Sequence, residues 1–152
     1  MNNKNDYTFN IALVGDSLVG KSSFINRLIN DDYSSIYNRT IGANCHIINR
    51  KINTKKIELQ IWDTSGEACF DKIKTIFYKD VDMIVLFFNI SDIITFKNIK
   101  KYIADIMSID RNKMIIIVGS MCDSPRMVSY TDAVDIGKTY VEISALKNIG
   151  IK

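Results

Sequence analysis

Residues 15–22 have the types and the spacing that phosphate binding requires. They read Gly-Asp-Ser-Leu-Val-Gly-Lys-Ser and fit the pattern G-x-x-x-x-G-K-S without a mismatch. Glycines let the backbone curl so that successive N–H groups point at phosphate oxygens, and the following helix adds the positive end of its dipole. Lys21 would place a point charge on the β- and γ-phosphates, and the Ser22 hydroxyl would bind Mg²⁺. The residues predicted to cradle a nucleotide here are Asp16, Ser17, Leu18, Val19, Gly20, Lys21, Ser22 and Ser23.

A second motif with chemically active residues lies at residues 62–66, which read Trp-Asp-Thr-Ser-Gly at the end of an expected strand. A carboxylate that leaves a buried strand beside a phosphate loop holds the Mg²⁺ ion, and we predict this role for Asp63. Gly66 would let a backbone N–H reach a γ-phosphate. The segment that follows Gly66 is therefore predicted to respond to the nucleotide.

These residues need a scaffold, and the apolar pattern predicts alternating strands and helices. Unbroken apolar runs at 83–88 and 114–118 are typical of strands buried on both faces, as in parallel sheets covered by helices. A hairpin is expected around residues 53–55, and the long polar loop 31–42 is predicted to be functional. The expected strands are 9–14, 45–52, 56–62, 83–88, 114–118 and 140–143, and the expected helices are 22–29, 96–107 and a short one within 132–138. This order predicts an α/β fold with a mostly parallel six-stranded sheet, one antiparallel edge hairpin and helices on both faces.

Composition excludes several other classes of protein. The chain has 152 residues and a net charge of +3, which is too mild for a nucleic-acid partner because such binding needs a clustered basic face. Its three cysteines have no C-x-x-C spacing, so neither a disulfide framework nor a zinc site is predicted, and a reducing compartment fits best. The longest apolar run, 83–90, is too short to cross a bilayer. We expect residues 1–7 to form a polar N-terminal extension and residues 8–152 to form one domain.

The phosphate loop, Thr-Ile-Gly at 40–42 and Leu-Gln-Ile-Trp-Asp-Thr-Ser-Gly at 59–66 occur in the order and spacing of a known family. With them the chain resembles the small GTPases of the Ras superfamily, and among these the Rab branch, from about residue 8 to about residue 149. The resemblance implies a P-loop GTPase domain that binds GTP or GDP with Mg²⁺ and acts as a cytoplasmic switch in membrane traffic. It also implies effectors, exchange factors and GTPase-activating proteins as partners at residues 31–45 and 65–79.

Further site residues are implied by the resemblance alone. The hydroxyl and carbonyl of Thr40 would reach Mg²⁺ and the γ-phosphate, and Tyr37 would cover the phosphates. The implied base-binding residues are Tyr33 against the guanine ring, Asp123 on the N1–H and the exocyclic amine, and the loop of Ser144 and Ala145, where the N–H of Ala145 would meet the guanine O6.

Several residues depart from the family pattern. Glu67 takes the place of the catalytic glutamine, which orients the attacking water by donating one hydrogen bond and accepting another, whereas an ionised glutamate only accepts. With Glu67 and Lys21 as the catalytic candidates, we therefore expect hydrolysis to be slow, altered or dependent on a partner. Ser120 and Met121 replace the Asn and Lys of the guanine motif, and Leu146 replaces a Lys. Three weakened contacts at about 0.5–1.5 kcal/mol each predict a loss of roughly one to three decades in nucleotide affinity.

The C-terminal region also departs from the pattern. Family members continue from the Ser-Ala loop into a long final helix and a tail with prenylated cysteines, whereas this sequence stops at Lys152 without a cysteine nearby. We therefore expect the final helix to be largely missing and no covalent membrane anchor in this chain, so that membrane contact would go through partners. The sheet face that this helix covers would be covered by a partner or a second copy, or the chain is a truncated form of limited stability.

Two other functions stay open at this point. A pseudo-GTPase, which is an interaction module with weakened nucleotide binding and no effective turnover, is consistent with Glu67, Ser120 and Met121. A P-loop kinase or ATPase is a more distant alternative, which Asp123 and the Thr-Ile-Gly motif disfavour.

Overall fold

The computed structural model describes residues 5–36, 38–66 and 78–151. Their sheet has six strands in the order β2-β3-β1-β4-β5-β6, and all neighbouring strands are parallel except β2 and β3. The elements are β1 (Tyr7–Val14), α1 (Lys21–Asn30), β2 (Ala43–Ile52), β3 (Lys55–Thr64), β4 (Met83–Asn89), α3 (Ile93–Ile109), β5 (Met114–Ser120), α4 (Tyr130–Val134) and β6 (Thr139–Glu142). The predicted α/β fold and its antiparallel edge hairpin are confirmed.

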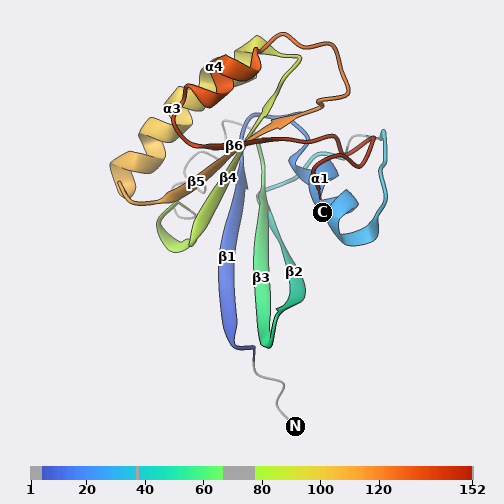
Figure 1. The fold of residues 1–152 in the computed structure, drawn as a ribbon, viewed down its shortest axis with the longest axis vertical. Coiled ribbons are helices and arrows are strands. Elements are labelled where there is room, and N and C mark those ends of the chain that lie inside the picture. The colour runs from blue at the N-terminus through green and yellow to red at the C-terminus, as the bar shows by residue number, and fades with distance from the viewer. Residues whose placement is uncertain (1–4, 37, 67–77, 152) are drawn as a thin grey trace.

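Alternate residues of the central strands enter two separate hydrophobic cores. In β1, Ala12 and Val14 join the core that contains Ile99 of α3, whereas Ile11 and Leu13 join the core under α1. A β-strand directs successive side chains to opposite faces, so both faces of the sheet must be covered. Figure 1 shows α1 on one side of the sheet and α3 with α4 on the other, which confirms the expectation of helices on both faces.

The edge hairpin is longer than predicted, and its extra length carries a functional residue to the site. A two-residue turn, Asn53–Thr54, joins β2 to β3, with Asn53 in the left-handed region at φ 53. At the other end β3 continues to Thr64, because the Thr64 hydroxyl donates a hydrogen bond of 2.6 Å to the Leu13 carbonyl of β1. This tertiary bond holds Asp63 beside the end of β1.

Helix α4 lies slightly earlier in the chain than predicted and is only five residues long. It begins after Ser129, whose hydroxyl accepts the Asp132 N–H at 3.0 Å, and this cap sets the start of the helix. The chain leaves the helix toward Gly137, which has φ 75. Between β3 and β4, residues 78–80 are helical, and residues 67–77 lie outside the described residues.

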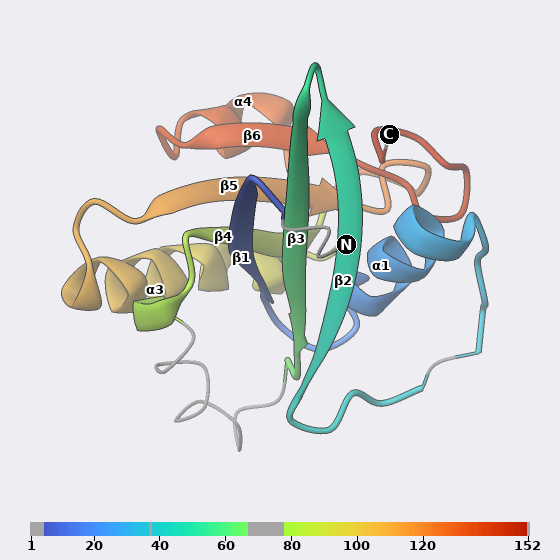
Figure 2. The ribbon, with the colours of Figure 1, turned by 90° about the horizontal axis from the view of Figure 1, so that it is seen from below.

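Residues 143–151 form a turn, and no helix follows β6 within the part of the chain that the structure describes. Ser144 and Ile149 form a short antiparallel bridge, and Ile151 is 7% exposed and packs in the core under α1. This segment passes beside α1 (Figure 2), so it covers part of that sheet face. Two large apolar side chains of the last two strands remain exposed, Val141 of β6 at 43% and Met114 of β5 at 61%. Among the described helices, none has the length and apolarity that a membrane crossing requires.

Candidate functional site

The loop between β1 and α1 is shaped by two glycines. Gly15 has φ 141, and a Cβ on it would lie 2.3 Å from the Phe87 carbonyl oxygen of β4, so no larger residue fits. Gly20 has φ 89 and is the N-cap of α1, where it provides no side-chain cap, and the first turn of α1 contains no acidic residue. The first N–H groups of α1 therefore have no side-chain acceptor at the cap and can bind an anion.

The Lys21 side chain folds back into this loop and bonds to its backbone. Its ammonium donates hydrogen bonds to the carbonyl oxygens of Gly15 at 2.9 Å and Asp16 at 2.7 Å, and the residue is 6% exposed. A buried ammonium is costly unless it is hydrogen-bonded, and here the loop itself provides the acceptors. The positive charge is thus held at the centre of the loop, where the sequence predicts phosphate oxygens.

The three predicted metal ligands lie together next to the loop. The Ser22 hydroxyl donates to Asp63 Oδ2 at 2.5 Å and lies 3.0 Å from the Thr40 hydroxyl, which is itself 3.4 Å from Asp63 Oδ2. Asp63 is 3% exposed, and its Oδ1 is buried without a hydrogen-bond partner. Two hydroxyls and a carboxylate with an unsatisfied buried oxygen are the oxygen donors that Mg²⁺ prefers. The residues present therefore fit a magnesium ion with its water ligands.

A pocket of about 220 Å³ opens over these residues. Most of the predicted phosphate-loop residues line it, together with Gly66 and with residues 33–36, 38 and 40 of the loop before β2. A Cβ on Gly66 would lie 2.3 Å from the Ser17 nitrogen, so the backbone of Gly66 lies directly against the loop. The predicted nucleotide-binding residues in the lining are Ser17, Leu18, Gly20, Lys21, Ser22, Ser23, Tyr33, Thr40 and Gly66. Tyr37 and Glu67 lie outside the described residues.

Six of the predicted site residues that the structure describes do not line the pocket: Asp16, Val19, Asp63, Asp123, Ser144 and Ala145. Val19 is 1% exposed and packs in the core under α1, so its side chain anchors the loop. The carboxylate of Asp16 accepts one hydrogen bond from Asn98 and one from Tyr102, each at 2.8 Å, so α3 holds the loop from the other side.

The predicted base-binding loops lie beyond the pocket at the carboxyl ends of β5 and β6. Backbone hydrogen bonds join them, from the Cys122 N–H to the Ile143 carbonyl at 3.0 Å and from the Ile143 N–H to the Gly119 carbonyl at 2.9 Å. Asp123 is exposed, and Ser144 is fully buried with its hydroxyl accepting the Lys147 N–H at 2.9 Å. The Ser144 side chain therefore shapes its own loop.

The residues that depart from the family pattern have distinct positions. The Ser120 hydroxyl donates a 2.9 Å hydrogen bond to the Phe88 carbonyl of β4. Met121 lines the pocket from a left-handed backbone position at φ 59. Burial raises the pKa of the neighbouring Cys122 thiol, and the carboxylates of Asp123 and Glu142 add to that shift. Cys122 is therefore a neutral thiol at pH 7, which does not favour a nucleophilic or metal-binding role.

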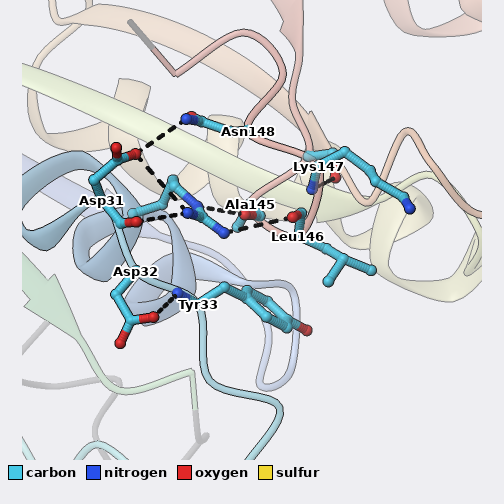
Figure 3. Close-up of polar contacts among 9 residues, drawn as sticks. Asp31, Asp32, Tyr33, Ala145, Leu146, Lys147 and Asn148 are labelled. Atoms are coloured by element: carbon cyan, nitrogen blue, oxygen red, sulfur yellow. Dashed lines mark hydrogen bonds and ion pairs between the residues drawn. The ribbon is translucent and has the colours of Figure 1, made fainter.

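Sequence reasoning missed the residues that hold these loops in place. They include Arg27 and Asp31 at the end of α1 and Asn148 after β6, which join α1 to the predicted base-binding loop (Figure 3). Arg27 has one sequence signal, because it and Lys21 are the only charged residues of α1. A cation in the last helical turn is ordinarily interpreted as a favourable partner of the helix dipole. That interpretation gives no reason to expect a contact between Arg27 and a distant loop.

Comparison with known proteins decides the family. Residues 10–152 match the family model described as the Ras family. The chain is 32% identical to the GTP-binding protein YPTM1 of Zea mays, over 100% of this chain and 76% of that protein. It is 36% identical to the Ras-related protein Rab-8A of Bos taurus, over 97% of this chain and 74% of the relative. It is also 36% identical to the Ras-related protein RIC1 of Oryza sativa subsp. japonica, over 95% and 75% of the two chains.

The chain belongs to the Ras family. The predicted resemblance to Ras-superfamily small GTPases of the Rab type is thereby confirmed. Membership agrees with the geometry of the site, since a small GTPase needs a phosphate loop at the carboxyl end of β1 and an acidic residue at the end of a neighbouring strand. In this small GTPase Lys21 and Asp63 occupy those two places.

Proposed function

We propose that this Ras-family protein binds GTP or GDP with Mg²⁺ and acts as a Rab-like switch in membrane traffic, with slow intrinsic GTP hydrolysis. The observation that supports the proposal best is the cluster of Ser22, Thr40 and Asp63 beside the buried ammonium of Lys21. A cation site next to an anion site is the arrangement that a magnesium–nucleotide complex requires.

Each part of the proposed phosphate site can be assigned to described residues. The N-terminal N–H groups of α1 and the Lys21 ammonium would hold the β- and γ-phosphates, and Ser22, Thr40 and Asp63 would hold the metal. When bound, Mg²⁺ neutralises charge on the phosphate oxygens. Because Thr40 belongs to the loop 31–42 and Gly66 to the segment after β3, a γ-phosphate would hold both against the phosphate loop, where they lie in this structure.

Slow hydrolysis is proposed from the chemistry of Glu67. An ionised glutamate cannot donate a hydrogen bond to a phosphate oxygen while it accepts one from water, and its charge repels the γ-phosphate. We further propose that effectors, exchange factors and GTPase-activating proteins act on residues 31–45 and 65–79, and that such partners bring the protein to the cytoplasmic face of membranes.

Titration with labelled GDP, GTP and ATP, followed by single-turnover hydrolysis, tests the proposal. We expect saturable binding of both guanine nucleotides and weak binding of ATP. Lys21→Ala and Ser22→Asn should each weaken retention of the nucleotide and Mg²⁺ by ten-fold or more, while circular dichroism stays that of a folded protein. Lys101→Ala, on an exposed position of α3, is the matched control and should bind normally. Normal binding by both site variants would refute the phosphate-loop assignment.

A second candidate function is a pseudo-GTPase that serves as an interaction module. The position of Ser120 favours it, because the hydroxyl bonds to Phe88 and leaves the phosphate loop without the bridge that an Asn would make. Saturable guanine-nucleotide binding without measurable turnover, in the presence of Mg²⁺, would support this alternative over the switch.

A further inference from the structure

The loop after β6, residues 144–149, is closed by its own hydrogen bonds. Ser144 and Ile149 exchange both backbone hydrogen bonds, at 3.0 Å and 2.9 Å, and the Ser144 hydroxyl accepts the Lys147 N–H at 2.9 Å. Asn148 has φ 54, as a tight turn requires. The loop is thus a small rigid body, and its place in the molecule depends on what attaches it to the rest of the domain.

Arg27 of α1 attaches the loop through its side chain, beside the backbone bonds of Ile143 and the core packing of Ala145 and Ile151. Its Nε donates to the Ala145 carbonyl at 2.8 Å, and its Nη2 approaches the Leu146 carbonyl at 3.4 Å. Its Nη1 donates to the carbonyl of Asp31 at 2.7 Å, which orients the guanidinium from the helix side. The Arg27 side chain is only 14% exposed, and its bond to the Ala145 carbonyl is partly buried, so this charge-assisted bond is partly shielded from water. A planar guanidinium holds two consecutive carbonyls in a fixed geometry, which an ammonium cannot do.

A second contact joins the same two segments. The amide of Asn148 donates to Asp31 Oδ1 at 3.1 Å, and Asp31 is the C-cap residue of α1. Asp32 follows directly, and its carboxylate accepts the N–H of Tyr33 at 2.7 Å. Figure 3 shows the segment 31–33 facing the loop 145–148 across these contacts. The segment that carries Tyr33 and the loop that carries Ala145 are therefore attached to the same end of α1.

We infer that Arg27 is a positioning residue for guanine recognition, an inference that rests on the proposed function. By holding the Ala145–Leu146 backbone against α1, Arg27 keeps the Ala145 N–H and the Tyr33 ring in register around the nucleobase. Base selection in this chain depends on that register, because Ser120, Met121 and Leu146 have replaced the side chains that secure the base in the family pattern. Arg27 does not line the pocket over the phosphate loop, and its contacts with Ala145 and Leu146 lie on the loop after β6.

The test compares ligands that contain the base with one that lacks it. Affinities for GDP, ADP and inorganic pyrophosphate, each with Mg²⁺, are measured for the wild type, Arg27→Gln and Arg27→Lys. Arg27→Gln should weaken GDP binding by about ten-fold or more and lower the GDP-to-ADP preference, while pyrophosphate affinity changes by less than about two-fold. Arg27→Lys should lie between the two, since an ammonium can still reach one carbonyl. Arg111→Gln, which removes an exposed arginine after α3, is the matched control and should leave all three affinities unchanged.

Amide hydrogen exchange without nucleotide provides the readout that separates this inference from the proposed function. Exchange at Lys147 and Ile149 should accelerate about ten-fold in Arg27→Gln and stay unchanged in Arg111→Gln. Unchanged GDP affinity in Arg27→Gln, or equal losses for GDP and pyrophosphate, would overturn the inference, and so would unchanged exchange. A wild type that binds no guanine nucleotide would overturn the proposed function and the guanine role of Arg27 together, while accelerated exchange would still show that Arg27 holds the loop.

Discussion

Replacing Ser120 by Asn and Met121 by Lys would restore two residues that the family pattern places around the guanine base. We expect the double variant to bind GDP more tightly than the wild type. A Cβ placed on Gly20 would lie 3.8 Å from the Ser120 Cβ and 3.9 Å from the Met121 terminal methyl, so longer polar side chains at both positions reach the phosphate loop and the pocket wall. Two regained contacts at about 0.5–1.5 kcal/mol each correspond to an affinity gain of roughly 5- to 150-fold.

The same substitution should lower the stability of the fold. Ser120 is 3% exposed, and its hydrogen bond to the Phe88 carbonyl is lost when Asn turns toward the phosphate loop. The expected change in the free energy of unfolding is about 0.5–1.5 kcal/mol, measured by urea denaturation without nucleotide. Tighter GDP binding together with a lower free energy of unfolding would indicate a specific contact with the nucleotide, because a general stabilisation of the fold would not lower the free energy of unfolding.

Titration with fluorescent GDP measures the affinity gain. Met127→Lys is the matched control, because it adds the same charge nearby at a side chain that is 63% exposed and does not line the pocket. Equal gains in the control and the double variant would mean that long-range charge attraction causes the effect. A folded double variant with unchanged or weaker GDP affinity would refute the conclusion that Ser120 and Met121 weaken the base site.

Three further predictions concern the switch segment and the sheet edge. Gly66→Ala places a Cβ 2.3 Å from the Ser17 nitrogen, so the backbone must move away from the loop; the GTP-to-GDP affinity ratio should fall about ten-fold, and an unchanged ratio would contradict contact with a γ-phosphate. Glu67→Gln should raise the single-turnover hydrolysis rate by at least about ten-fold, and an equal or lower rate would show that Glu67 does not limit turnover. Arg126 lowers the pKa of Glu142 through a 2.6 Å ion pair, so this stabilisation is present above the unfolded pKa and is lost as pH falls through the lowered folded pKa. Arg126→Met should therefore unfold more easily than the wild type at pH 7, by about 0.5–1 kcal/mol, and denaturation curves should show this difference shrinking as the pH falls through the lowered folded pKa of Glu142.

Local sequence patterns predicted the parts of the molecule that local physics determines. The strands β4 and β5 follow from unbroken apolar runs, and both begin where the runs begin. The phosphate loop was predictable because its glycines and Lys21 are adjacent in the chain and each has a separate chemical reason. Asp63 was predictable because it ends a strand next to that loop.

Contacts between distant residues were not predictable in this way. Arg27 and Ala145 are 118 positions apart, and Asn148 and Asp31 are 117 apart, so no spacing rule connects them. The extension of β3 to Thr64 likewise depends on a hydrogen bond to another strand. The sequence therefore predicted residues that the structure brings together beside the phosphate loop, and it gave no sign of the contacts that join α1 to the loop after β6.

We propose above that Ser22, Thr40 and Asp63 form a magnesium site that serves a guanine nucleotide on the phosphate loop. Isothermal titration of the wild type and Asp63→Ala with GDP, in Mg²⁺ and in EDTA, tests it most directly. We predict saturable GDP binding by the wild type that weakens at least about ten-fold in EDTA, and binding by Asp63→Ala that is weaker and no longer depends on Mg²⁺. Absence of saturable GDP binding, or the same dependence on Mg²⁺ in both proteins, would contradict the claim.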